Sequence, residues 1–191
     1  MYLIIVFGWI IYFAVHSFLA ANNVKQWFKL HLPVIYKYYR MLYNIIAIIG
    51  LLILIQITFS DSKLLFTTNR MTNSIAVVLF LTGSGILTIS FYTFDKMEFL
   101  GLRIPEKNEQ SKLVVSGIYQ YMRHPLYSGT FFLVAGVLLW HPTVAIALFF
   151  AITILYIEIG SRLEERKLTE EFGQAYSTYA ETVKRYFPYL Y

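Results

Sequence analysis

The sequence predicts an all-α integral membrane protein with about five transmembrane helices, the last two forming a tight hairpin. Of its 191 residues, 58% are hydrophobic and only 14% are charged, whereas a soluble domain has about 45–50% apolar and about 25% charged residues. Several apolar stretches approach the roughly 20 residues that a helix needs to cross the hydrocarbon core. Lysine and arginine gather in alternate connecting segments, as they do in membrane proteins.

Three apolar segments in the N-terminal half can each span a membrane: Tyr2–Ala20, residues 41–59 and about 72–94. No Lys or Arg precedes the first segment, which favours a retained helix, because a secretory signal peptide normally has a charged start. The Ala20–Ala21 pair keeps a cleavable signal as the alternative. Residues 22–33 mix lysine with Trp and Phe, which is typical of a helix lying in the membrane interface.

The apolar stretch from Leu126 to about Gly160 is too long for one span and contains Pro142. Proline removes a helical hydrogen bond and clashes with the preceding turn. We therefore expect two helices, at residues 126–140 and 143–159. Beyond them, apolar residues recur at helical spacing and predict an amphipathic C-terminal helix from Ser161 to about Arg185. The apolar positions are Leu168, Phe172, Tyr176, Tyr179 and Val183.

The charge distribution predicts the orientation. Fourteen of the 16 Lys and Arg residues lie in segments that five spans place on one side, and only Lys63 and Arg70 lie on the other. The positive-inside rule therefore places the N-terminus outside and the C-terminus in the cytoplasm. We expect a single membrane domain over residues 1–191. Its N-terminal part, 1–94, holds three transmembrane helices, and 95–191 holds a loop, the helical hairpin and the C-terminal helix.

The composition also excludes several kinds of site. The chain has no cysteine, which rules out disulfides, thiolate metal sites and cysteine nucleophiles. Its four histidines show no spacing typical of metal ligands, so no metal site is expected. The net charge is +5, but the sequence carries no basic motif of a nucleic-acid-binding module. Membrane lipids are therefore the expected partners of the basic segments.

The segment 113–127 contains the strongest indications of a site. Pro125 suits the first turn of a helix, so Arg123 and His124 would lie at the positive end of that helix, where anions are favoured. Gly117 permits a tight turn before it. The alternative is an ordinary loop at the membrane surface, in which Arg123 meets lipid phosphate.

Other polar residues offer both functional and structural interpretations. Glu158 and Arg162 are four apart and could pair on one helix face, since a carboxylate within a membrane is costly without a partner or a cavity. Glu164 could bind a ligand or form part of a solvated helix start. His16 in the first span could complete a packing hydrogen bond, or it could face a pocket and accept a proton near neutral pH.

The pattern Gly-x-Tyr-x-x-x-Arg-His-Pro-x-Tyr from Gly117 to Tyr127 resembles that of the isoprenylcysteine carboxyl methyltransferase superfamily. The apolar hairpin and the tail that begins with Glu164-Glu165 and ends with Arg185-Tyr-Phe-Pro188 fit the same family, over about residues 111–188. Shorter matches resemble the bacterial methanethiol S-methyltransferase and NnrU-type branch, which implies a bacterial inner-membrane protein. These matches are His16-Ser17, Tyr39-Arg40-x-x-Tyr43-Asn44, and the stretch from Phe94-Asp95 to Arg103.

The resemblance implies S-adenosylmethionine as cofactor and a small thiol or a lipidic molecule as methyl acceptor. The residues expected at the cofactor are Lys112, Leu113, Val114, Gly117, Tyr119, Arg123, His124, Pro125, Tyr127 and Glu164. His16 or Arg162 is expected to favour the anionic form of the acceptor. Prenylcysteine enzymes carry an arginine where Gly160 stands here, which argues against that substrate.

Several alternatives to a thiol methyltransferase stay open. The chain could be a prenylcysteine carboxyl methyltransferase, a phospholipid methyltransferase or a non-enzymatic accessory protein of NnrU type. Membrane sterol reductases that use NADPH share a similar C-terminal part, but they are much longer. A transporter is disfavoured, because the sequence shows no internal repeat.

Overall fold

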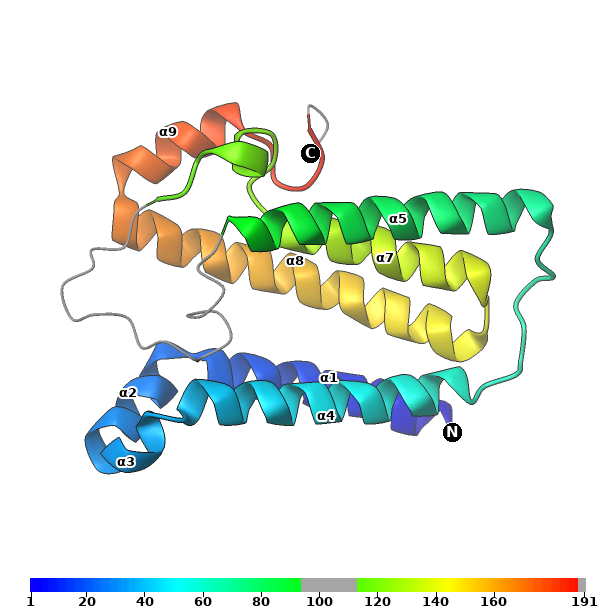
Figure 1. Cartoon of the computed structure of the whole chain (residues 1–191), viewed down its shortest axis with the longest axis horizontal. Coiled ribbons are helices and arrows are strands. Elements are labelled where there is room, and N and C mark those ends of the chain that lie inside the picture. Colours follow the sequence, from blue (N-terminus) through cyan, green and yellow to red (C-terminus); the bar gives the residue numbers. More distant parts are fainter. Residues whose placement is uncertain (94–112, 189–191) are drawn as a thin grey trace. The chain divides into compact units, whose positions relative to one another are not determined.

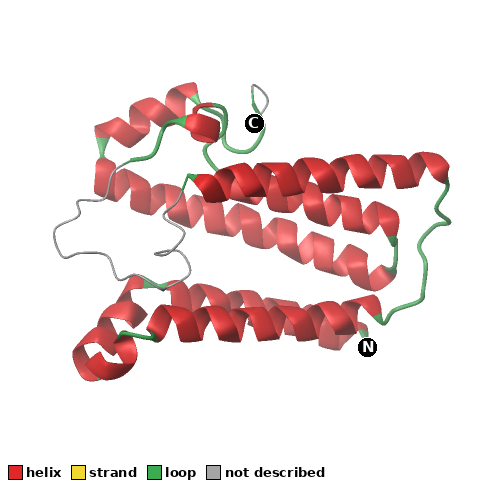
Figure 2. Ribbon diagram, viewed as in Figure 1, coloured by secondary structure: helices red, strands yellow, loops and turns green. Residues whose placement is uncertain are grey.

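The computed structural model describes residues 1–93 and 113–188, which form helices and connecting segments without a strand (Figure 2). A shorter apolar helix, α7, accompanies four helices that are long and apolar enough to cross a membrane. The long helices are α1 (Tyr2–Ala20), α4 (Tyr39–Phe59), α5 (Arg70–Tyr92) and α8 (Val144–Phe172), and α7 is Pro125–Trp140. The predicted all-α membrane class, with an apolar hairpin at its C-terminal end, is confirmed.

The described chain forms two compact units. The N-terminal unit contains residues 1–63 and 143–152, and the C-terminal unit contains residues 64–93, 113–142 and 153–188. Helix α8 therefore begins in the first unit and continues in the second. The sequence did not predict this division.

Within the N-terminal unit, α1 and α4 lie side by side (Figure 1) and meet through aromatic side chains. Trp9 is only 1% exposed. Its Nε1 donates to Thr58 Oγ1 at 3.0 Å, and its ring lies 4.1 Å from the ring centroid of Phe149 in α8. The hydroxyl of Tyr12 donates to the carbonyl oxygen of Ala47 at 3.2 Å. Amphipathic aromatic residues thus join the two spans.

Two short helices, α2 (Asn22–His31) and α3 (Pro33–Tyr36), connect α1 to α4. Neither helix buries a residue within the unit, and Leu30 in α2 is 78% exposed. Such exposed apolar residues beside lysines agree with the interfacial position that the sequence predicts for residues 22–33.

Asp61, in the segment after α4, stabilises the start of α8. This carboxylate is 4% exposed. It accepts hydrogen bonds from the backbone N–H of Ala145 at 3.0 Å and from that of Lys63 at 3.1 Å. The first N–H groups of a helix have no partner within the helix, so this carboxylate satisfies one of them.

In the C-terminal unit, α5 and α7 pack at close range through glycines. Asn69 and Thr72 form a capping box that begins α5. A Cβ added to Gly83 of α5 would lie 2.6 Å from the carbonyl oxygen of Gly129 in α7. A Cβ at Gly136 would likewise lie 2.8 Å from the carbonyl oxygen of Ala76. Small residues allow this approach of two backbones, as they do in membrane helix pairs.

The tail departs from the single helix predicted to run from Ser161 to about Arg185. Helix α8 ends at Phe172, and a separate helix, α9 (Gln174–Thr182), follows. Gly173 between them has a φ of 53°, a value that glycine adopts readily and that lies outside the α-helical range. The apolar stripe predicted for one helix is therefore divided between two.

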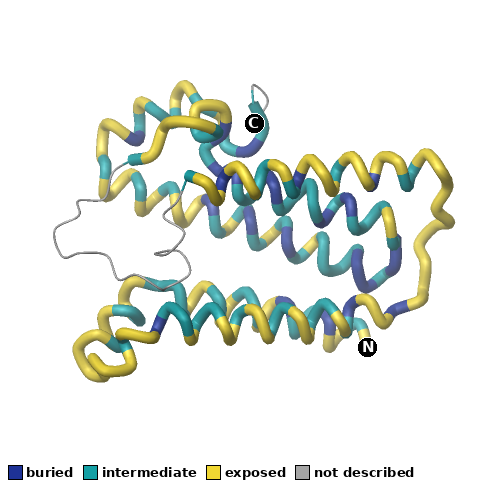
Figure 3. Tube along the Cα trace, viewed as in Figure 1, coloured by how far each residue is buried: buried dark blue, intermediate teal, exposed yellow. Residues whose placement is uncertain are grey.

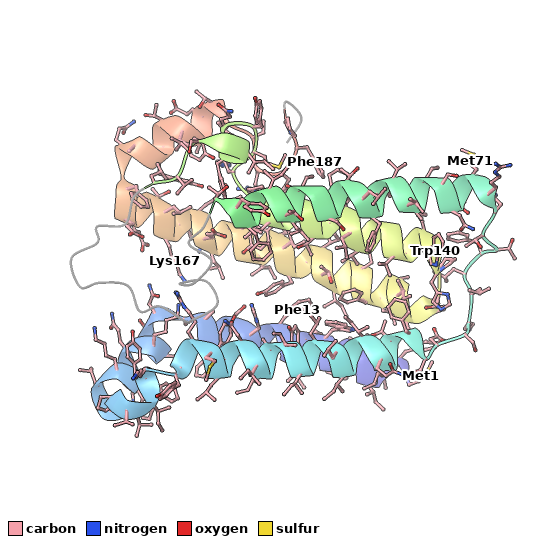
Figure 4. The ribbon with its side chains drawn as sticks, viewed as in Figure 1. Met1, Phe13, Met71, Trp140, Lys167 and Phe187 are labelled. Atoms are coloured by element: carbon pink, nitrogen blue, oxygen red, sulfur yellow. The ribbon has the colours of Figure 1, made fainter. Side chains whose placement is uncertain are left out.

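After α9, the chain returns to the start of α7 as a segment that we call the C-terminal strap (residues 183–187). The backbone N–H groups of Arg123 and His124 donate to the carbonyl oxygens of Lys184 and Arg185, at 2.9 and 3.0 Å. Phe187, labelled in Figure 4, packs against the rings of two phenylalanines of α7 at centroid distances of 5.6 Å. The strap thus fixes the beginning of α7.

Candidate functional site

The site begins with the short 3₁₀ helix η1 (Gly117–Gln120), which precedes α7. Gly117 has a φ of 64°, as expected for the tight turn that the sequence predicts there. The hydroxyl of Tyr179 in α9 donates to the carbonyl oxygen of Tyr119 at 2.6 Å. Burial raises the pKa of Tyr179 to about 12, so this phenol keeps its proton and holds η1 against α9.

His124 lies directly before α7, and Pro125 occupies the first turn, as predicted. The residue is 4% exposed. Its Nε2 lies 3.3 Å from Glu165 Oε1, and its Nδ1 lies 3.6 Å from Glu164 Oε2. Burial alone would lower the pKa of His124, but the carboxylates of Glu164 and Glu165 outweigh burial and raise that pKa above its ordinary value.

Glu164 is the accessible carboxylate of the pair. Its side chain is 49% exposed, although the adjacent imidazole is buried. The charge of Glu164 also acts on the phenols of Tyr119 and Tyr127 and contributes to the raised pKa of Tyr119. The structure therefore brings Tyr119, His124, Tyr127 and Glu164 together in one polar cluster at the start of α7.

Glu165, the next residue of α8, has a different environment. Its side chain is 15% exposed, and it pairs with two arginines. Arg123 donates to Glu165 Oε1 from Nε at 3.0 Å and from Nη2 at 2.7 Å. Arg185 of the strap donates from Nε to Oε1 at 3.2 Å and from Nη2 to Oε2. One carboxylate thus joins α7, α8 and the strap.

Arg123 makes further hydrogen bonds to the end of α9. Its Nη1 donates to the carbonyl oxygens of Ala180 and Val183. Helix C-termini leave carbonyl groups without partners, and a guanidinium satisfies two of them here. These contacts explain Arg123 as an organising residue, whereas its contact with a cofactor stays a prediction.

A second group of polar residues surrounds Glu158, about two turns before Glu165 on α8. The hydroxyl of Tyr186 donates to Glu158 Oε2 at 2.9 Å and also contacts Ser161 Oγ. Burial raises the pKa of Tyr186 to about 12, so it remains a donor. Arg162 Nε donates to Glu158 Oε1 at 2.6 Å, which confirms the predicted pair four residues apart.

Arg162 pairs with Glu158 and lies three residues before Glu165, so the side chains of Arg162 and Glu165 are neighbours on one face of α8. The side chain of Arg162 is 62% exposed. It contributes to a surface groove of about 440 Å³ that also includes the strap. The groove is lined by Arg162, Glu165, Arg166, Thr169, Glu170 and Arg185.

His16, the other proposed catalytic residue, belongs to the N-terminal unit. Its Nε2 lies 2.9 Å from the hydroxyl of Tyr43 in α4, and its ring stacks on that of Tyr12 at 6.1 Å. All three residues line an apolar groove of about 270 Å³ between α1 and α4. The structural alternative, a packing hydrogen bond, is therefore present, and the catalytic role of His16 stays a prediction.

The remaining predicted cofactor residues lie before η1. Val114 is 37% exposed and Leu113 is half-buried, both in an irregular segment. Lys112 lies outside the described residues. In residues 1–93 and 113–188, no three His, Asp or Glu side chains form a group that could hold a metal ion.

Sequence reasoning did not assign a site role to Glu165, Arg185 or Tyr186. All three occur in the motifs that carried the resemblance, at Glu164-Glu165 and at Arg185-Tyr-Phe-Pro188. The motifs therefore marked these residues as candidates, but only the fold shows that they lie close to Arg123 and His124.

This arrangement can bind a small molecule that carries one positive and one negative group. The half-exposed Glu164 offers a carboxylate for an ammonium group. In the described structure no side chain caps the N-terminus of α7, and such a terminus favours a carboxylate. An α-amino acid group presents these two charges together, so the residues present fit the amino-acid end of S-adenosylmethionine.

Comparison with known proteins agrees with this chemistry. The family profile described as phospholipid methyltransferase matches residues 71–175. The chain is 28% identical to a methanethiol S-methyltransferase of Pseudomonas deceptionensis over 182 residues, which are 92% of this chain and 68% of that protein. It is 39% identical to protein-S-isoprenylcysteine O-methyltransferase B of Arabidopsis thaliana over 92 residues, 44% of this chain and 43% of the relative.

A third relative, the methanethiol S-methyltransferase of Crocosphaera subtropica, is 31% identical over 121 residues. That match covers 59% of this chain and 46% of the relative. The chain thus spans only part of the relatives that it matches. No solved structure matches it.

Proposed function

Because the chain belongs to the phospholipid methyltransferase family, we propose that it is a membrane enzyme that transfers a methyl group from S-adenosylmethionine to a small thiol or a lipidic acceptor. Relatives named methanethiol S-methyltransferase favour the thiol. The likeness to a prenylcysteine enzyme of Arabidopsis thaliana favours the lipidic alternative. A site open to both the cytosol and the bilayer would admit either kind of acceptor.

The observation that carries the proposal is the pairing of buried His124 with half-exposed Glu164 at the start of α7. Glu164 would bind the ammonium group of the cofactor, and the N-terminus of α7 would bind its carboxylate. Tyr119, Tyr127 and Pro125 would line the adenosine side, with Leu113, Val114 and Lys112 at its edge. Gly117 would shape the turn that brings η1 to this position.

When bound, S-adenosylmethionine supplies a sulfonium methyl group, which passes to the acceptor sulfur while the sulfonium takes back the bonding electron pair. In-line approach decides the rate of such a step, so positioning can supply much of the catalysis. The residues of this chain would hold the two reactants and exclude water. Arg162 or His16 would favour the thiolate form of the acceptor, which has already lost its proton.

Calorimetric titration of the purified protein in detergent with S-adenosylmethionine tests this proposal. We expect saturable binding that is lost in His124→Ala and in Glu164→Ala. Glu170→Ala is the matched control, because Glu170 is an exposed carboxylate on the same helix, and it should bind like the wild type. A folded wild-type protein that does not bind the cofactor would favour the non-enzymatic accessory function instead.

We further propose that the site faces the cytoplasm across a bacterial inner membrane, as the distribution of lysine and arginine suggests. The natural chain contains no cysteine, so a single introduced cysteine reports on orientation without background. Ser177→Cys in α9 should react with a membrane-impermeant maleimide only after cells are opened. Reaction in intact cells that have a permeable outer membrane would reverse the proposed orientation.

A further inference from the structure

The adjacent carboxylates Glu164 and Glu165 of α8 differ in their exposure and in the number of charged groups that they contact. Glu165 is 15% exposed, and the structure gives it two arginines and one histidine as partners. Glu164 is 49% exposed and faces His124 alone among ion-pair partners in the described residues. Glu165 thus already accepts from three protein groups, so we expect its effect on a cofactor bound at Glu164 to act through these neighbours.

His124 connects the two carboxylates. Its Nε2 faces Glu165 at 3.3 Å and its Nδ1 faces Glu164 at 3.6 Å. A neutral imidazole has one N–H and one nitrogen lone pair. Since each ring nitrogen faces a carboxylate, a neutral ring would point its lone pair at one of them, which is unfavourable. An imidazolium donates from both nitrogens and suits both carboxylates.

The other groups around the ring are compatible with this charge. Tyr127 and Tyr186 lie beside it, at centroid distances of 5.5 and 6.1 Å. The cations of the cluster, Arg123 and Arg185, both direct N–H groups to Glu165. They therefore fix Glu165 in place while Glu165 still accepts from His124.

We propose that Glu165 is a positioning residue: it fixes the His124 ring through Nε2, and the ring in turn directs Glu164 toward the ammonium group of the bound cofactor. The proposal rests on the proposed function, because it assumes that the cofactor binds at Glu164. A half-exposed glutamate has several accessible rotamers, so a fixed neighbour reduces the entropy lost on binding. Supporting hydrogen bonds of this kind commonly hold a binding residue in its productive geometry.

Histidine NMR tests the first link without any ligand. The chain has only four histidines, so selective ¹⁵N labelling gives few ring signals, and His124→Ala identifies those of His124. We expect both ring nitrogens of His124 to be protonated at pH 6.5, and Glu165→Gln to shift its titration to lower pH. The signals of His16, His31 and His141 should be unchanged, which would show that the variant is folded.

Cofactor titration of the same variants tests the second link. Glu165→Gln should weaken S-adenosylmethionine binding by about ten- to a hundredfold, the contribution of a hydrogen bond to a charged group. Glu165→Asp keeps the charge and should recover part of the affinity. Glu170→Gln, on the same helix, should bind like the wild type.

The outcomes separate this inference from the proposed function. If the wild type binds the cofactor and folded Glu165→Gln binds it equally well, the positioning role is wrong while the proposed function stands. A neutral His124 in the wild type at pH 6.5, or an unchanged titration in Glu165→Gln, would also overturn it. If the folded wild type binds no cofactor, the proposed function fails, and the inference fails with it as a statement about a ligand.

Discussion

In the N-terminal unit, α1 and α4 contact each other through side chains. In the C-terminal unit, α5 and α7 contact each other through their backbones, and ion pairs hold the segment at the start of α7. An added Cβ at Gly8 of α1 would meet the end of the Leu54 side chain at 2.8 Å, but one at Gly83 of α5 would meet backbone at 2.6 Å. A leucine can turn away, whereas a helix backbone cannot. Figure 3 shows a related contrast, with exposed positions recurring along α1 and α4 and buried positions recurring along α7.

This difference indicates that the C-terminal unit has the more fixed geometry of the two. A binding site needs side chains held in place by their neighbours, and the charged cluster of Arg123, Glu165 and Arg185 provides this in the C-terminal unit. The N-terminal pair has an adaptable aromatic contact and an apolar groove.

Replacing Arg123 with alanine should have the largest effect on stability. It removes the donors to Glu165, Ala180 and Val183 and leaves a largely buried carboxylate with fewer partners. Breaking such a pair costs about 3 kcal/mol or more. Thermal unfolding in detergent measures the effect, with Arg166→Ala on the exposed surface of α8 as control. Equal stability of the two variants would contradict the assigned role of the cluster.

Replacing Gly83 with alanine should separate α5 from α7, at a cost of about 1–3 kcal/mol for overpacking. Gly85 is the matched control, because a Cβ there meets nothing within 4 Å. Gly85→Ala should leave the unfolding temperature unchanged or slightly raised, since alanine favours helix more than glycine. If the two variants unfold alike, the backbone contact is not tight.

The pH dependence of stability should reveal the charge on His124. Its pKa in the folded protein lies above the ordinary value of 6.5, so its stabilising contribution is complete below pH 6.5 and is lost as pH rises through the folded pKa. The loss is about 1.4 kcal/mol for each unit of upward shift. Unfolding temperatures of the wild type should therefore fall above pH 6.5 more steeply than those of His124→Gln. Parallel slopes would argue for a neutral histidine.

In the N-terminal unit, Trp9→Phe should have a smaller effect. It removes the hydrogen bond to Thr58 Oγ1 but keeps an aromatic ring in the core, so we expect a loss of about 1 kcal/mol. Thr58 can still donate to the carbonyl oxygen of Leu54. A loss as large as that of Arg123→Ala would remove the contrast between the units.

Gly8→Ala should have the smallest effect, within about 0.5 kcal/mol. The contact that an added Cβ would make is with a flexible leucine end, and alanine gains helix propensity over glycine. Comparison with Gly83→Ala in the same unfolding assay gives the sharpest test of side-chain against backbone packing. A larger effect for Gly8→Ala would reverse the comparison.

Much of the fold followed from local sequence patterns. Pro142 divided one long apolar stretch into two helices, and Pro125 marked the start of α7, as predicted. The family resemblance is also confirmed by the profile match over residues 71–175. The break at Gly173 was not predicted, because the apolar residues on either side keep helical spacing across it.

The charged cluster could not be predicted from spacing. Glu165 meets Arg123 from 42 residues away and Arg185 from 20 residues away, and helical periodicity reports only on near neighbours. The pair of Glu158 and Arg162 was predictable because it lies within one turn. The sequence motifs predicted Glu164 and His124 as site residues, which stays a prediction, and the fold shows which groups surround them.

Detection of the methylated product would show whether methyl transfer depends on the cluster around His124 and Glu164. Membranes containing the protein would receive methanethiol and S-adenosylmethionine with a deuterated methyl group, and volatile products would be measured by gas chromatography and mass spectrometry. We predict labelled dimethyl sulfide from the wild type and from Glu170→Ala, and none from Glu164→Ala. A folded wild type that labels neither the thiol nor any membrane lipid would contradict the proposed methyl transfer.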